Sequence, residues 1–278
     1  MNILTLGEVV GRAGITAIKK ELPSLKKEYN VDLTIANCEG ATGGFGLGKN
    51  HSLYLHKLGI DVITIGEKGF YKKDLVDFIP KANFILRPLN YPPEAPGHFW
   101  KTITINEIPI TIICAMGLSG FERTHLNNPF TYIISLLEKL KEKSSVFIIE
   151  FHGCTTAEKY SLLHLLKGKV SIIFGSHTKA ISGDIQILDG TGFICDTGRC
   201  GSLMSVGGFE PSIEIQRFLT AIPSRSGESF EQLEIQGALF SIDENGHCSD
   251  CKKIRKIVPL SDEEKESLLA SQNQEESL

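Results

Sequence analysis

The sequence of 278 residues has no long apolar run, no excess of basic charge and few aromatic side chains. Aromatic residues make up 8% of the chain, and tryptophan occurs once. No stretch approaches the roughly 20 consecutive apolar residues that a membrane-spanning helix needs. The net charge of -4 offers no basic surface for nucleic acid or for lipid head groups. We therefore expect no membrane partner, and the sequence carries no strong nucleic-acid signature.

Cysteines are few, odd in number and scattered, which is not typical of the disulfide framework of a small secreted protein. They are Cys38, Cys114, Cys154, Cys195, Cys200, Cys248 and Cys251. The last two have C-x-x-C spacing, but the second pair that a zinc site would need is missing. Because Glu244-Asn245-Gly246 precedes them as a hairpin-turn signal, we expect a solvent-side turn there.

The N-terminus lacks the features of a signal peptide. Residues 1–7 form a short apolar run without a basic region before it, and the chain turns polar at Glu8. We expect a buried strand here and a cytoplasmic protein.

Short apolar runs alternate with helical periodicity through the first 80 residues. Strands are expected at 2–6, 33–36 and 61–65, and helices at 16–29, 51–58 and 72–78. This order predicts an α/β fold with a parallel sheet covered on both faces.

A second strand–helix–strand unit spans residues 145–179. Apolar runs at 146–149 and 170–174 flank a helical segment at 157–166, and each run leads to a histidine, His152 and His177. The remaining patterns predict hairpins of 98–105 with 108–114 and of 230–242 with 247–259, a helix at 132–141, and strands at 185–188 and 192–196.

The chain shows no internal repeat and no clear linker, so a single domain over residues 1–260 is expected. Residues 261–278 are charged and poor in hydrophobic side chains, which indicates a frayed helix or disorder.

Five apolar runs are followed, beside a glycine, by a side chain that can bind a metal. These residues are Glu8, Glu39, Glu67, His152 and His177. The carboxyl ends of parallel strands meet at one edge of a sheet, so three carboxylates and two imidazoles should converge. Any one of these glutamates alone is more often a helix cap. Any one of these histidines alone is more often a core residue whose hydrogen bonds are satisfied. Together they favour a site for zinc, iron or manganese.

The order of these motifs resembles the calcineurin-like metallophosphoesterases, and among them the bacterial 2′,3′-cyclic-nucleotide phosphodiesterases. The resemblance covers residues 1–260. Supporting matches are Arg87-Pro88, Asn90-Tyr91-Pro92, Thr156-Ala157-Glu158-Lys159, Asp196-x-Gly198-x-x-Gly201 and Arg217-Phe218-Leu219-Thr220. The resemblance implies a four-layer α/β/β/α sandwich with two packed mixed sheets, hydrolysis of phosphoric diesters, and a homo-oligomer.

This chain departs from the family at the residues that the resemblance assigns to the first metal ion. The family has an aspartate, a bridging glutamate, an asparagine and a histidine. The corresponding residues here are Glu8, Glu39, Gly40 and Lys179. Glycine has no side chain, and a protonated lysine is only a donor and cannot ligate a metal. We therefore expect a degenerate first site.

The second ion's positions keep residues that can ligate. They are Glu39, Glu67, His152 and His177, with Glu67 standing where the family has asparagine. The sequence thus predicts at most one divalent transition metal, with a metal-free protein as the alternative.

Lys68 and Lys179 stand where the family has histidines of the site. The resemblance places Lys68 at the position of the acid that protonates the leaving oxygen, a role for which lysine needs a strongly lowered pKa. Loss of a metal ion leaves carboxylates facing one another, which is costly in a buried place. We hypothesise that Lys179 pairs with Glu8 or Glu39, and that Lys68 faces Glu67 or the substrate.

Two functions stay open. The first is a phosphodiesterase with at most one metal ion and impaired activity. The second is a catalytically inactive pseudoenzyme that binds a nucleotide or a protein, with lysines in place of metal charge. The residues Gly40, Lys68 and Lys179 favour the second.

The glycine-rich stretch from Gly43 to Asn50 offers a different alternative. It is one residue short of the G-x-x-x-x-G-K-[ST] phosphate loop of nucleoside triphosphatases, and Asn50 replaces the hydroxyl that binds magnesium. The stretch also begins well after the preceding strand. We favour a flexible rim over the site.

Overall fold

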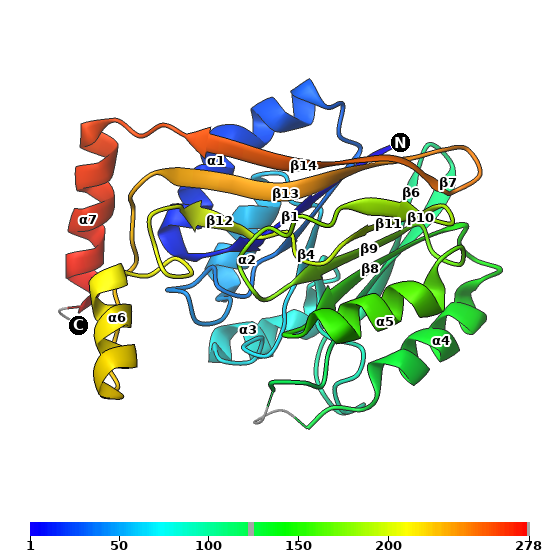
Figure 1. Cartoon of the computed structure of the whole chain (residues 1–278), viewed down its shortest axis with the longest axis horizontal. Helices are drawn as coiled ribbons and strands as arrows, with labels where there is room; N and C mark the ends of the chain where they lie inside the picture. Colours follow the sequence, from blue (N-terminus) through cyan, green and yellow to red (C-terminus); the bar gives the residue numbers. More distant parts are fainter. Residues whose placement is uncertain (122–124, 277–278) are drawn as a thin grey trace.

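The computed structural model describes residues 1–121 and 125–276, and it has two mixed β-sheets packed face to face between layers of helices (Figure 1). The layers confirm the predicted four-layer α/β/β/α sandwich.

The first sheet has a parallel centre with an antiparallel hairpin inserted beside it. Strands β1, β3, β4 and β5 run parallel, and the long strand β13 pairs antiparallel with β1. In spatial order the strands are β2 (Glu8–Val9), β12 (Arg199–Ser202), β13 (Leu233–Ile242), β1 (Asn2–Leu6), β3 (Leu33–Asn37), β4 (Val62–Thr64) and β5 (Ile85–Leu86), with β14 (Cys248–Val258) paired to β13.

The second sheet is parallel through four strands and closes with an antiparallel strand at each edge. Its order is β10 (Gln186–Leu188), β11 (Thr191–Ile194), β9 (Ile172–Ser176), β8 (Val146–His152), β7 (Ile108–Met116) and β6 (Trp100–Ile105).

Three hydrophobic cores hold the layers together. Helices α1 (Gly11–Glu28), α2 (Lys49–Lys57) and α3 (Lys73–Phe78) pack on the first sheet, and α4 (Pro129–Leu140) and α5 (Thr156–Leu166) pack on the second. Along β8, Val146 and Ile148 enter the core between the sheets, whereas Phe147 and Ile149 face the helices. Because both faces are buried, the strands are mostly apolar.

The tail forms a helix, α7 (Asp262–Glu276), where a frayed helix or disorder was expected. Its start is a capping box: Ser261 Oγ accepts from the Glu264 backbone N–H at 3.2 Å, and the Glu264 carboxylate accepts from the Ser261 N–H at 2.8 Å. Lys20 of α1 binds the same carboxylate at 2.7 Å. Residues 277–278 of the predicted tail lie outside the described residues.

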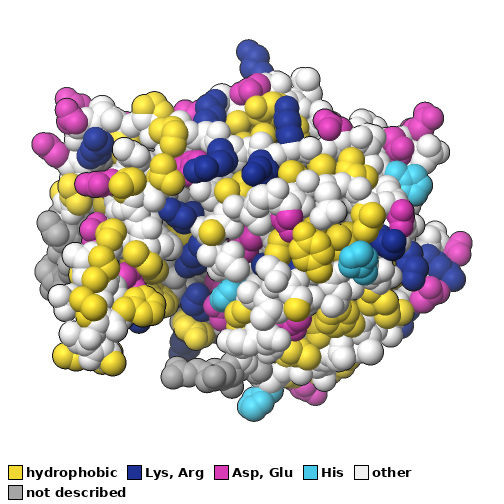
Figure 2. Space-filling model, viewed as in Figure 1, with side chains coloured by type: hydrophobic (Ala, Val, Ile, Leu, Met, Phe, Trp, Pro, Cys, Tyr) yellow, Lys and Arg dark blue, Asp and Glu magenta, His cyan; other side chains and the backbone are white. Residues whose placement is uncertain are grey.

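Helix α6 (Pro211–Thr220) was not predicted, and none of its residues is buried. It lies at the end of the molecule away from α4 and α5 (Figure 1). Its apolar side chains gather on the surface (Figure 2). They include Ile215, Phe218 and Leu219. Within the described residues, no helix is both long and apolar enough to cross a membrane.

The expected placement of Cys248 and Cys251 on a solvent-side turn is wrong. The turn ends before them, at Gly246, and both lie in β14. Cys248 is buried in the core between the sheets, where its sulfur lies against Gly192. Packing of an apolar thiol therefore accounts for Cys248.

Candidate metal centre

The predicted residues at the strand ends meet at one edge of the sandwich, but they come from two sheets instead of one. Glu39 and Glu67 follow β3 and β4 of the first sheet. His152 ends β8 and His177 follows β9 of the second sheet. The packing of the sheets brings carboxylates from one layer against imidazoles from the other.

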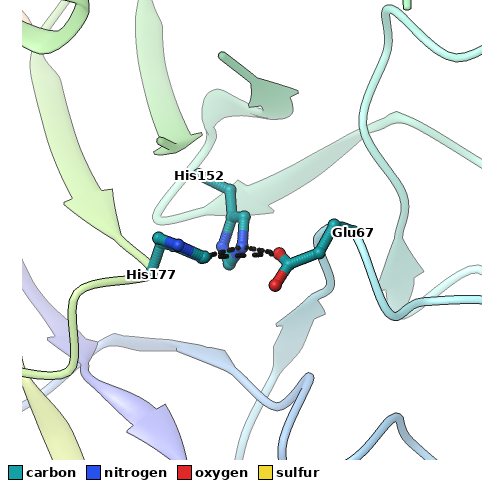
Figure 3. Close-up of side chains that lie close together, drawn as sticks. All are labelled: Glu67, His152 and His177. Atoms are coloured by element: carbon teal, nitrogen blue, oxygen red, sulfur yellow. Dashed lines mark hydrogen bonds and ion pairs between the residues drawn. The ribbon is translucent and has the colours of Figure 1, made fainter. Parts of the chain in front are cut away.

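Glu67, His152 and His177 form a compact group whose ligand atoms all lie within 4.8 Å of one another (Figure 3). Glu67 Oε2 lies 2.5 Å from His152 Nε2 and 3.4 Å from His177 Nδ1. The two imidazole nitrogens are 3.1 Å apart. One carboxylate and two imidazoles are a donor set suited to a divalent transition metal.

Glu39 stands beside this group. Its Oε1 accepts from the backbone N–H of Gly66 at 2.8 Å and of Lys68 at 2.6 Å. Its Oε2 lies 3.3 Å from His152 Nε2 and is buried without a hydrogen bond from any described residue. A buried carboxylate oxygen is costly without a cation near it, and here either a protonated His152 or a metal ion held by Glu67, His152 and His177 can supply that charge. The residues present therefore fit one metal ion.

The carboxylates control the protonation of His152. Burial lowers the pKa of His152, but Glu39 and Glu67 outweigh burial and raise this pKa well above its usual value. Burial raises the pKa of Glu67, but hydrogen bonds from His152 and His177 outweigh it and hold the pKa below its usual range. Without a metal, the centre is an imidazolium held by carboxylates.

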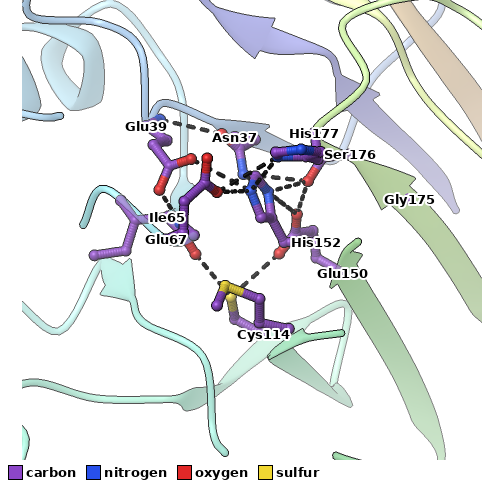
Figure 4. Close-up of polar contacts among 12 residues, drawn as sticks. Asn37, Glu39, Ile65, Glu67, Cys114, Glu150, His152, Gly175, Ser176 and His177 are labelled. Atoms are coloured by element: carbon purple, nitrogen blue, oxygen red, sulfur yellow. Dashed lines mark hydrogen bonds and ion pairs between the residues drawn. The ribbon is translucent and has the colours of Figure 1, made fainter. Parts of the chain in front are cut away.

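A buried network behind His152 sets its orientation (Figure 4). Ser176 Oγ donates to Glu150 Oε1 and lies 2.8 Å from His152 Nδ1. Because the single hydroxyl proton of Ser176 goes to Glu150, the N–H at Nδ1 donates to Ser176, and Nε2 faces Glu67. Asn37 also contacts His152 Nδ1, at 3.3 Å. Sequence reasoning missed these residues, although polar Asn37 and Glu150 in buried strands were an available signal.

The residues predicted to form a degenerate first metal position contact one another. Lys179 Nζ lies 3.2 Å from Glu8 Oε1, and the Glu8 side chain is 1% exposed. A Cβ on Gly40 would lie 2.5 Å from the same oxygen. Among the described residues no group of three metal-ligating side chains occurs here. The ion pair hypothesised for Lys179 is present, and Glu8 occupies the space beside Gly40.

Lys68 faces Glu67 as hypothesised, with its Nζ 3.0 Å from Glu67 Oε1. Its side chain is 19% exposed, so the ammonium group is at the mouth of the site. Lys68 and Lys179 thus bring two positive charges to a centre rich in carboxylates.

Tyr91 of the Asn90-Tyr91 motif holds the loop of Gly66 beside the site. Tyr91 donates to the backbone oxygen of Gly66 at 2.9 Å. A Cβ on Gly66 would lie 2.3 Å from the His152 ring, so the close approach of this loop needs glycine. Phe121 closes one side, with its ring 5.0 Å from that of His177.

Two further motif residues, Lys159 and Asp196, hold the loop of His177. Lys159 Nζ lies 3.1 Å from Asp196 Oδ2 in a buried pair, and Asp196 accepts from the Thr178 N–H at 3.0 Å. His177 has a φ of 100°, which is costly for a residue other than glycine. The buried ion pair helps to keep His177 in this conformation.

The nucleoside triphosphatase alternative does not fit the structure. Lys49 opens α2, and its backbone N–H is capped by the Asp74 carboxylate at 2.8 Å. Its ammonium group lies over the Phe78 ring, 5.3 Å from the centroid. The N-terminus of α2 is therefore occupied by a carboxylate.

Two packed mixed sheets, with glutamates and histidines converging from their strand ends, define a metallophosphoesterase. The family described as YmdB-like protein matches residues 4–254. The chain belongs to this family.

Similarity to individual proteins supports membership of this family. The chain is 31% identical over 259 residues to a 2′,3′-cyclic-nucleotide 2′-phosphodiesterase of Bacillus subtilis strain 168, covering 93% of this chain and 97% of that protein. A solved structure from Mycoplasma pneumoniae, described as a novel phosphatase, matches with a TM-score of 0.88 at 30% identity, covering 92% and 93% of the two chains. A hypothetical protein from Thermus thermophilus matches with a TM-score of 0.87 at 28% identity, covering 93% and 100%.

Proposed function

We propose that this chain is a phosphodiesterase that uses a single divalent metal ion, iron, manganese or zinc, on a nucleotide substrate. The observation that carries the proposal is the compact group of Glu67, His152 and His177, beside which the buried Glu39 Oε2 lies 3.3 Å from His152 Nε2. Such an ion would polarise a phosphoryl oxygen as a Lewis acid.

The lysines suit the binding of a phosphoryl group. Each ammonium carries three donors, and the pairs with Glu67 and Glu8 use one donor of each. The remaining N–H groups of Lys68 and Lys179 can bind the non-bridging oxygens of a phosphodiester. In this role they supply positive charge in place of the first ion.

The second candidate is a pseudoenzyme that binds the same ligand without turnover. The pair of Lys179 with Glu8 beside Gly40 favours it, because two-metal hydrolysis is not available in its usual form. Burial lowers the pKa of Lys68, but Glu39, Glu8 and Glu67 outweigh burial and raise it. Lys68 then keeps its proton near neutral pH and binds as a cation.

Metal analysis and a phosphodiester assay separate the candidates. We expect one manganese ion per chain after loading, and hydrolysis of 2′,3′-cyclic AMP that is lost in His152→Ala. Lys49→Met, outside the centre, is the matched control. One ion and tight nucleotide binding without hydrolysis selects the pseudoenzyme. Two ions per chain, or no metal at all, contradicts the single-metal site.

A further inference from the structure

The loop after β3 contacts Glu8 at Gly40. Its following residues, Thr42, Gly43 and Phe45, line a separate cavity. The cavity has a volume of about 330 Å³, within the range of small-molecule sites. Thr42 and Phe45 of the loop form one wall. The start of α1 and residues 225–228 form the others.

The cavity is positively charged. Arg12, Lys72 and Arg225 line it, against one carboxylate, Glu228. That carboxylate accepts from the Arg12 backbone N–H at 2.7 Å and so faces the N-terminus of α1, whose dipole it complements. The excess of positive charge favours an anion, and a phosphate group has the oxygens that arginine and lysine bind well.

Two further features of the cavity suit a nucleotide. Ser226 Oγ is buried and has no hydrogen-bond partner among the described residues, so a polar ligand group can satisfy it. The Phe45 ring is 47% exposed and packs against Phe209, with the centroids 5.5 Å apart. An exposed, supported ring is a platform on which a base stacks.

The cavity and the candidate metal centre share a wall. The Gly40 carbonyl accepts from the Gly44 N–H at 3.0 Å and from the Gly11 N–H at 2.9 Å, which ties the loop and the start of α1 together beside Glu8. Lys179, the partner of Glu8, lies over the Phe209 ring, 5.8 Å from its centroid. Phe209 in turn supports Phe45, so the two sites are adjacent.

We propose that this cavity is a second phosphate subsite, so that the ligand is a nucleotide chain with at least two phosphate groups. It rests on the proposed function: one phosphodiester lies at the metal centre, and the phosphate of the neighbouring nucleotide lies between Lys72 and Arg225. The adjoining base stacks on Phe45.

The test compares two dinucleotides, pApA and ApA, which differ only in a 5′-phosphate and carry a phosphorothioate linkage that resists hydrolysis, by calorimetry with the manganese-loaded protein. In the wild type we expect pApA to bind at least tenfold tighter, because the extra phosphate gains charge-assisted hydrogen bonds. In Lys72→Met/Arg225→Met this advantage falls to about one, while ApA binding is unchanged. Lys19→Met/Lys27→Met, which removes two exposed cations of α1, is the matched control and keeps the advantage.

The outcomes distinguish this inference from the proposed function. If ApA binds and the 5′-phosphate adds nothing, or if the advantage persists in Lys72→Met/Arg225→Met, the subsite is wrong and the proposed function stands. If neither dinucleotide binds while 5′-AMP binds the wild type but not that variant, the subsite stands and the proposed function fails. Unfolding temperatures within the control's range show that the variants are folded.

Discussion

At the scale of single residues, the most consequential contact is the ion pair of Lys179 with Glu8. Glu8 is buried and accepts no hydrogen bond from the described residues, so its charge is balanced by Lys179 at 3.2 Å. A buried pair can cost more in desolvation than its attraction returns, but loss of one partner is strongly destabilising. Glu8 and Lys179 therefore depend on each other.

We predict that Lys179→Met lowers the free energy of unfolding by about 3 kcal/mol, because it strands the Glu8 carboxylate. The double variant Lys179→Met/Glu8→Gln should recover much of this loss, since the remaining side chains are neutral. Urea denaturation of both variants and of Glu8→Gln gives the coupling energy. Additive losses would show that the two side chains do not interact.

The cysteines are predicted to differ sharply in reactivity. Burial raises the pKa of Cys195 to about 11 and that of Cys200 to about 12. At pH 8 about one thousandth of Cys195 is thiolate, and this fraction rises as the pH approaches 11. Cys154 and Cys251 are partly exposed. We expect a disulfide reagent to label these two first at pH 8, and the other five only after denaturation. Rapid native labelling of all seven would contradict this.

At the scale of elements, α5 connects the two histidine loops through Lys159. This side chain is 1% exposed, and it binds both Asp196 and the Ser176 carbonyl. A buried lysine on a helix is thus used to fix the strand end that leads to His177. This contact explains the lysine of the Thr156-Ala157-Glu158-Lys159 motif.

Lys159→Met should cost about 3–5 kcal/mol of stability, because it leaves the buried Asp196 carboxylate unpaired. It should also weaken manganese binding by loosening the His177 loop. Lys167→Met at the end of the same helix is the control, since its pair with Asp189 is exposed and worth under about 1 kcal/mol. Chemical denaturation and metal titration measure both. Equal losses in the two variants would refute the role of Lys159.

The strands could be predicted from the sequence where burial on both faces makes them mostly apolar, as in β8 and β9. Strand β12, of sequence RCGS, carries no such pattern, because backbone pairing with β2 and β13 holds it. Helix α6 buries no residue, so it leaves no core periodicity to detect. Neither β12 nor α6 therefore carries a sequence pattern from which it could be predicted.

The metal-ligating residues of the site could likewise be predicted from the sequence, but the residues that support them could not. Each predicted metal ligand follows an apolar run, so its place at a strand end could be predicted from the sequence. The roles of Glu150, Ser176 and Phe121 could not, because they depend on which loops meet after the two sheets pack. Glu150 and Ser176 are 26 positions apart and touch only through the pairing of β8 with β9.

At the scale of the whole molecule, the expected single domain over residues 1–260 stays a prediction that truncation can test. Removal of residues 261–278 deletes α7, whose ion pair with Lys20 is partly exposed. We expect a loss of about 1–3 kcal/mol, from this ion pair and from Leu268, which packs against the core, and a single cooperative thermal transition. Ending the chain at residue 247 is the contrast, because it removes β14 from β13 and should abolish folding. An unfolded protein after the first deletion would show that α7 is essential.

The homo-oligomer implied by the family resemblance also stays a prediction. Sedimentation velocity of the intact chain at several concentrations tests it, and a monomer at all of them would contradict it.

The contact between Gly40 and Glu8 makes residues 8, 40 and 179 interdependent. An asparagine at residue 40 would bring its Cβ to 2.5 Å from Glu8 Oε1, so Glu8 would have to move. Displacing Glu8 breaks its pair with Lys179, and replacing Lys179 first strands Glu8. Each single substitution at these positions is therefore unfavourable unless the other two accompany it. We therefore expect these three positions to change together among relatives of this chain.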